Sequence, residues 1–161
     1  MKIAIIYASK HGTTEKVAVS IAEKLSKNNE VELITIKKNE NPDVSGFGTV
    51  ILGSSIYAGK ASGKMQSFCT KNEQVLLQKK LGLFVCGMEP SRAKRQKELA
   101  DAYPEVLSKS AVATGFLGGE FKFEEMNFFE RFIIKRISKT NESVSRIDEH
   151  AMEVFVEKMI V

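Results

Sequence analysis

The chain of 161 residues has a formal net charge of +4, and 43% of its residues are hydrophobic. These values are typical of one globular domain, residues 1–161, and the small positive excess gives no argument for nucleic-acid binding. No window approaches the roughly 18 apolar residues of a membrane-spanning helix, and Cys69 and Cys86 lack metal-site spacing, so we expect a cytoplasmic protein with reduced thiols and no metal.

Strand-like and helix-like segments alternate along the chain. A continuous apolar run at residues 2–8 predicts a buried strand, and apolar residues at helical spacing follow in residues 14–28. Further strands are predicted at 31–36, 49–54, 81–86 and 111–118, further helices at 61–78, 92–108 and 148–160, and a loop at 39–48. This alternation predicts an α/β fold, with a five-stranded parallel sheet covered by helices on both faces.

The segment after the first strand is rich in small and hydroxyl residues. It comprises Ser9, Lys10, His11, Gly12, Thr13 and Thr14. The first backbone N–H groups of a helix have no partner within the helix and favour an anion, while glycine permits close approach. The loop lacks both the Lys-Ser/Thr ending of a nucleotide-binding P-loop and a complete GxGxxG motif. These absences favour a monophosphate held by neutral donors over ATP, GTP or NAD. The alternative is an ordinary helix N-cap.

Two later strands end in comparable loops. The loop after the third strand contains Ser55, Ile56, Tyr57, Ala58 and Gly59, and the fourth strand leads into Cys86, Gly87, Met88 and Glu89. Because parallel strands place their carboxyl ends at one edge of the sheet, we expect the three loops to share one site there.

The first loop, from Ile5 to Thr14, resembles the phosphate-loop signature of flavodoxins, and residues 54–59 resemble their second flavin loop. The resemblance implies the flavodoxin-like, doubly wound strand order 2-1-3-4-5 and non-covalent FMN as cofactor. It also implies that the aromatic ring of Tyr57 flanks the flavin ring, although an ordinary loop aromatic is the alternative. The flavin supplies the redox chemistry, and the catalytic residues of the chain itself stay unknown.

Residues 120–147 form an insert between the fifth strand and the last helix. Its centre, residues 125–139, has an aromatic face beside several positive charges. Such a pattern predicts either a helix lying on an anionic membrane surface or a helix packed on its own domain. The substrate or membrane candidates are Phe128, Phe129, Arg131, Phe132, Lys135 and Arg136, with Arg92 and Arg95 after the third loop. For each cation the alternative is a solvated helix face.

The insert from Phe128 to His150 is similar to that of the bacterial quinone-dependent protoporphyrinogen oxidase family. That resemblance implies a flavoprotein oxidoreductase of haem biosynthesis, peripheral on the inner face of the cell membrane, which oxidises protoporphyrinogen IX and passes electrons to a quinone. Two alternatives stay open. One is a flavodoxin-type electron carrier between redox-partner proteins, and the other is an interaction module that has lost its flavin.

Overall fold

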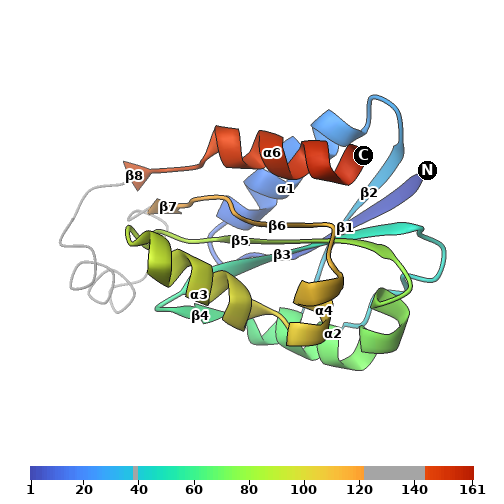
Figure 1. The fold of residues 1–161 in the computed structure, drawn as a ribbon, viewed down its shortest axis with the longest axis horizontal. Coiled ribbons are helices and arrows are strands. Elements are labelled where there is room, and N and C mark those ends of the chain that lie inside the picture. The colour runs from blue at the N-terminus through green and yellow to red at the C-terminus, as the bar shows by residue number, and fades with distance from the viewer. Residues whose placement is uncertain (38–39, 122–143) are drawn as a thin grey trace.

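The computed structural model describes residues 1–37, 40–121 and 144–161. Its centre is a parallel sheet in the order β2-β1-β3-β5-β6, which confirms the predicted 2-1-3-4-5 arrangement. The helices α1 and α6 cover one face of this sheet, and α2, α3 and α4 cover the other (Figure 1). The strands are β1 (Lys2–Ala8), β2 (Glu30–Thr35), β3 (Thr49–Tyr57), β4 (Lys60–Ala61), β5 (Lys80–Cys86), β6 (Ala113–Phe116), β7 (Glu120–Phe121) and β8 (Val144–Ser145). The helices are α1 (Thr13–Leu25), α2 (Gly63–Leu76), α3 (Arg92–Ala102), α4 (Glu105–Ser110) and α6 (Glu149–Ile160).

The central strands are buried on both faces. In β1 the residues from Ile3 to Ala8 alternate between two hydrophobic clusters, one beneath α1 and α6 and one beneath α2, α3 and α4. Ile5 points into the first cluster with Phe155, and Ile6 into the second with Phe68. A strand with apolar surroundings on both sides has a continuous hydrophobic sequence, which is why the pattern predicted it well.

The helix expected at residues 92–108 is two helices. Tyr103 is extended (φ −130°, ψ 154°), and Pro104 is the N-cap of α4. The ring of a proline disfavours a helical conformation in the residue before it, so the chain bends here. The buried Tyr103 hydroxyl lies 3.0 Å from the carbonyl oxygen of Leu52 and 2.6 Å from that of Phe84, which ties the bend to β3 and β5.

Three short strands were not predicted. β4 pairs antiparallel with the extended end of β3, and β7 pairs antiparallel with β8. We call the β7–β8 pair the stem, because the segment 122–143 leaves and returns through it. Most of the predicted insert, including the helix expected at 125–139, lies outside the described residues.

Candidate functional site

The loops that follow β1 and β3 lie against each other at the carboxyl edge of the sheet. The Lys10 ammonium nitrogen lies 3.7 Å from the centroid of the Tyr57 ring, and the rings of His11 and Tyr57 have centroids 6.2 Å apart. Residues 46 and 47 positions apart in the sequence therefore form one surface, as the shared carboxyl edge predicted.

The first loop ends at the N-terminus of α1. We call the open backbone there, residues 12–15, the cradle. Gly12 has φ +86°, and a Cβ added there would meet nothing within 4 Å. The backbone N–H of Gly12 donates to the Ser9 hydroxyl oxygen over 3.0 Å, and the backbone N–H of Lys16 donates to the carbonyl oxygen of Gly12. No side chain caps the helix. The backbone N–H groups between these two donors, at residues 13–15, point out of the helix end, an arrangement that suits an anion.

Thr14, in the first turn of α1, carries a buried hydroxyl next to this helix end. Its side chain is fully buried, and its hydroxyl oxygen makes no hydrogen bond of standard geometry, although it faces the weakly interacting thiol of Cys86. A buried hydroxyl without a strong partner is uncommon and calls for a ligand or another explanation. This group and the open space at Gly12 fit a phosphate.

The second loop is a tight turn between β3 and β4. Ala58 and Gly59 have φ +50° and +79°, and a Cβ on Gly59 would meet nothing within 4 Å. Ser54 holds the base of the turn, because its buried hydroxyl oxygen accepts a hydrogen bond from the backbone N–H of Ser62 over 3.1 Å. Ser54 begins the segment that resembles the second flavin loop, although the predicted site residues of this loop began at Ser55.

The third loop is held by backbone contacts and by the side chains of Glu89 and Arg95. The N–H of Gly87 donates to the carbonyl oxygen of Gly118 over 2.9 Å, and a Cβ on Gly119 would lie 2.8 Å from the Gly87 oxygen. Glu89 accepts from the backbone N–H of Ser91 over 3.0 Å. The loop and the base of the stem therefore form one packed unit.

The two cations predicted after the third loop have different surroundings. Arg95 is partly buried, donates to the carbonyl oxygen of Pro90 over 2.9 Å and lies 5.9 Å from the Phe116 ring. Arg92 is exposed at the start of α3. Arg95 thus supports the loop, and Arg92 faces solvent. The other candidates, Phe128, Phe129, Arg131, Phe132, Lys135 and Arg136, lie outside the described residues.

A buried carboxylate joins the stem to the first turn of α1. Glu120, whose side chain is 4% exposed, accepts from the Lys16 ammonium and from the Ser145 hydroxyl, each over 2.9 Å. Lys16 and Glu120 are 104 positions apart, so no local signal could have revealed the contact. The cradle and both strands of the stem therefore meet at one ion pair.

Both thiols are buried. Burial raises the pKa of Cys86 from 9.0 to about 12, the Glu120 carboxylate acts in the same direction, and the Thr14 hydroxyl opposes it. Burial likewise raises the pKa of Cys69 to about 12, and burial raises that of Tyr103. Cys86, predicted beside the cofactor, is therefore a neutral thiol under the cradle rather than a nucleophile.

These pKa values predict alkaline destabilisation. A thiol whose pKa is raised by folding contributes stability below about pH 9 that is lost as the pH rises toward about 12. The urea midpoint should therefore fall between about pH 8 and about pH 10.5. The double variant Cys69→Ala, Cys86→Ala should lose less over the same interval. An equal loss in both proteins would assign the effect to other groups.

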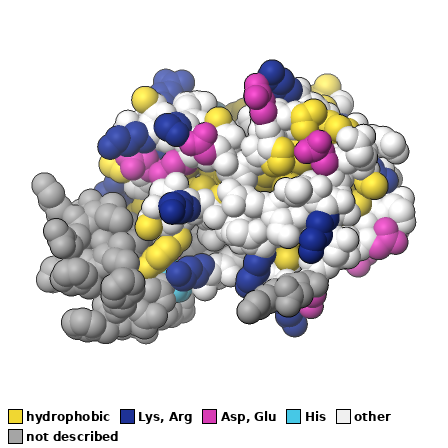
Figure 2. All heavy atoms as spheres, turned by 90° about the horizontal axis from the view of Figure 1, so that it is seen from below, with side chains coloured by type: hydrophobic (Ala, Val, Ile, Leu, Met, Phe, Trp, Pro, Cys, Tyr) yellow, Lys and Arg dark blue, Asp and Glu magenta, His cyan; other side chains and the backbone are white. Residues whose placement is uncertain are grey.

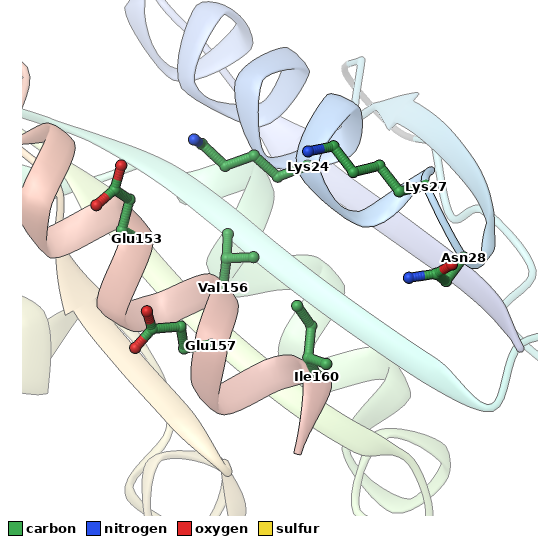
Figure 3. A pocket seen from close by; sticks show the side chains of 7 residues that line it. All are labelled: Lys24, Lys27, Asn28, Glu153, Val156, Glu157 and Ile160. Atoms are coloured by element: carbon green, nitrogen blue, oxygen red, sulfur yellow. The ribbon is translucent and has the colours of Figure 1, made fainter.

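A hollow of about 260 Å³ lies at the opposite end of α1 (Figure 3). It is lined by Lys24, Lys27, Asn28, Glu153, Val156, Glu157 and Ile160. Since α1 has 13 residues at 1.5 Å each, this hollow is about 20 Å from the cradle. None of its residues belongs to the three loops.

Among residues 1–37, 40–121 and 144–161, no group of His, Cys, Asp and Glu could hold a metal ion. No helix in this part of the chain is long and apolar enough to cross a membrane.

The sheet order and the three loops define a doubly wound α/β protein with a ligand site at the carboxyl edge of its sheet. Residues 4–148 match the flavodoxin domain family, and the chain belongs to that family. No curated protein matches the sequence.

The solved flavodoxins from Bacillus cereus and Streptococcus pneumoniae share the fold. Oxidised flavodoxin 1 from Bacillus cereus is 18% identical, with a TM-score of 0.60 over 99% of this chain and 97% of its own. The Streptococcus pneumoniae TIGR4 flavodoxin is 16% identical, with a TM-score of 0.60 over 99% and 98%. The Fusobacterium nucleatum flavodoxin, solved with flavin mononucleotide bound, is 21% identical over 70% of this chain and 68% of its own, with a TM-score of 0.48.

Proposed function

We propose that this chain binds FMN non-covalently and transfers electrons between redox partners. The observation that carries the proposal is the open cradle. No side chain caps the N-terminus of α1 there, and the buried Thr14 hydroxyl makes no standard hydrogen bond. It is joined directly to an aromatic loop, because Lys10 and His11 pack on Tyr57. One end of the site suits a phosphate and the other a planar ring.

The residues have separate roles in this proposal. The backbone N–H groups at residues 13–15 and the Thr14 hydroxyl hold the phosphate, with Ser9 fixing the loop. Tyr57 stacks on one side of the ring system, while the Ala58–Gly59 turn and residues 87–89 line its edge. FMN supplies the one- and two-electron redox chemistry when bound. The chain holds it, orients it and limits water around it.

Flavin titration tests this function. The purified protein, freed of any flavin, should quench FMN fluorescence with a stoichiometry of about one and acquire a yellow colour. Replacement of Tyr57 by alanine should lower the FMN affinity about tenfold, since base–aromatic stacking contributes about 1–3 kcal/mol. A protein that leaves FMN fluorescence unchanged would contradict the proposal and favour the module without flavin.

A second candidate is oxidation of protoporphyrinogen IX with a quinone as acceptor. It is favoured by the stem, because Glu120 joins the base of the aromatic and basic insert to the first turn of α1, beside the cradle. The test is anaerobic turnover of protoporphyrinogen IX by the FMN-loaded protein with a soluble menaquinone analogue, followed by porphyrin fluorescence. Turnover no faster than with free FMN would exclude this reaction and leave the electron carrier.

A further inference from the structure

The carboxyl edge of the sheet carries a cluster of exposed cations beside the three loops. They are Lys60 in β4, Lys64 in the first turn of α2, and Arg92 and Lys94 in the first turn of α3. We call these four residues the basic face. β4 extends from the second loop, α3 follows the third, and α3 packs against β4, so the four residues lie on one side of the site.

The three cations at helix N-termini do not stabilise their helices. The N-terminus of a helix favours anions, yet α2 and α3 have no acidic residue in their first turns and carry Lys64, Arg92 and Lys94 there. None of the four cations has a carboxylate within 4.0 Å in the described part of the chain, although other lysines there do.

The neighbouring acids turn inward. Residues 60–72 and 90–97 contain no Asp or Glu. Glu89 is partly buried and accepts from the Ser91 backbone, and the partly buried Glu98 has its pKa raised by burial and by Glu89, with Lys94 opposing. The surface that faces solvent is therefore positive. Figure 2, which views the side of α2 and α3, shows dark-blue Lys and Arg side chains spread over this face, with magenta Asp and Glu side chains among them.

We propose that the basic face docks an acidic redox protein next to the flavin, with electrostatic attraction setting the rate of association. This inference rests on the proposed FMN function. Complementary charge around a redox site steers the partner and increases the association rate 10- to 1,000-fold at low salt. A protein partner is favoured over a lipid surface because, among residues 1–37, 40–121 and 144–161, the large exposed hydrophobic side chains do not belong to the basic face: they are Met1, Val19, Leu33, Val75, Val106, Val112, Ile160 and Val161.

The test uses two haem proteins of opposite charge as probes, acidic cytochrome b5 and basic cytochrome c. The FMN-loaded protein is reduced anaerobically and mixed with either ferric probe in a stopped-flow instrument. Each FMNH₂ oxidised passes two electrons to two ferric haems and releases two protons. We expect the rate with cytochrome b5 to fall about tenfold between about 20 and about 300 mM NaCl, and the rate with cytochrome c to rise or stay constant.

Charge reversal locates the effect. The variant Lys64→Glu, Arg92→Glu, Lys94→Glu should react with cytochrome b5 at least tenfold more slowly at low salt. The matched control reverses Lys27, Lys71 and Lys158, which are exposed and lie away from the loops. Each reversal changes the charge by −2, so both variants go from +4 to −2, but the control should lose less than threefold. Equal losses would overturn the proposal.

Two further measurements distinguish failure of the proposed FMN function from failure of docking at the basic face. FMN affinity is measured for all three proteins, because absence of FMN binding would reject the proposed function alone. The basic face is then tested without electron transfer, by NMR titration of ¹⁵N-labelled protein with cytochrome b5, where shifts should gather in β4 and the first turn of α3. Cosedimentation with phosphatidylglycerol vesicles that is lost only in the basic-face variant, together with an unchanged cytochrome b5 rate, would overturn the protein partner in favour of a membrane.

Discussion

Replacing Gly118 by alanine is expected to lower the free energy of unfolding by about 3 kcal/mol. Gly118 has φ +80°, a conformation that costs an L-residue about 1–2 kcal/mol. Its added Cβ would also lie 2.0 Å from the carbonyl oxygen of Arg146 and 2.9 Å from the backbone nitrogen of Asp148. Both obstacles are backbone, so a side-chain rotation cannot relieve the contact.

Urea unfolding measures this loss, with Gly46→Ala as the control. Gly46 is in a turn, its φ is outside the left-handed region, and a Cβ there would meet nothing within 4 Å. That variant should stay within about 0.5 kcal/mol of the parent protein. If Gly118→Ala were equally stable, the backbone around Arg146 would have to shift at little cost, and the third loop and the base of the stem would not be the tightly packed unit described above.

Replacing Thr14 by valine is expected to raise the dissociation constant for FMN at least tenfold. The change keeps the shape of the side chain and removes its hydroxyl, whose hydrogen bond to a charged phosphate would contribute about 1.5–3 kcal/mol. Because Thr14 is fully buried and its hydroxyl makes no standard hydrogen bond, its removal should cost the flavin-free protein little stability.

Riboflavin is the comparison ligand that shows whether Thr14 acts on the phosphate or on the ring system. It has the same ring system as FMN but no phosphate, so Thr14→Val should leave its affinity unchanged. Thr70→Val is the matched control, since the exposed Thr70 hydroxyl only donates to the carbonyl oxygen of Gln66 within α2. Equal losses of affinity for FMN and riboflavin would place Thr14 away from the phosphate and contradict the assigned role of the cradle.

The parts of the fold that follow from local patterns were predictable. The continuous apolar run of β1 and the alternation in β2, an edge strand, predicted these strands correctly, whereas the correct sheet order followed from the resemblance to flavodoxins. The break at Pro104 was missed although proline disfavours a helical residue before it, because the apolar spacing through Leu107 continued the helical pattern. Val75 lies two helical turns after the buried Phe68, a spacing typical of the same helix face, yet it is 39% exposed at the last turn of α2.

The candidate site was only partly accessible from sequence. Gly12 and the hydroxyl residues around it stand in one short stretch, and the structure places them around an open helix N-terminus. The support of the site depends on contacts between distant segments. Glu120 meets Lys16, and Gly119 packs on Gly87, and neither contact has a local signature. Such residues are selected by three-dimensional fit, which one sequence does not express.

The stem also determines how freely the length of the connecting segment can vary. β7 and β8 are neighbouring antiparallel strands, in which Glu120 pairs with Ser145 and Phe121 with Val144. Residues 121 and 144, between which the connecting segment runs, therefore lie side by side. Because the entropy of closing a loop grows only with the logarithm of its length, segments of very different length can be exchanged between these two points at small cost. The stem is thus a position at which the connecting segment can change in length while the five-stranded sheet of this fold stays unchanged.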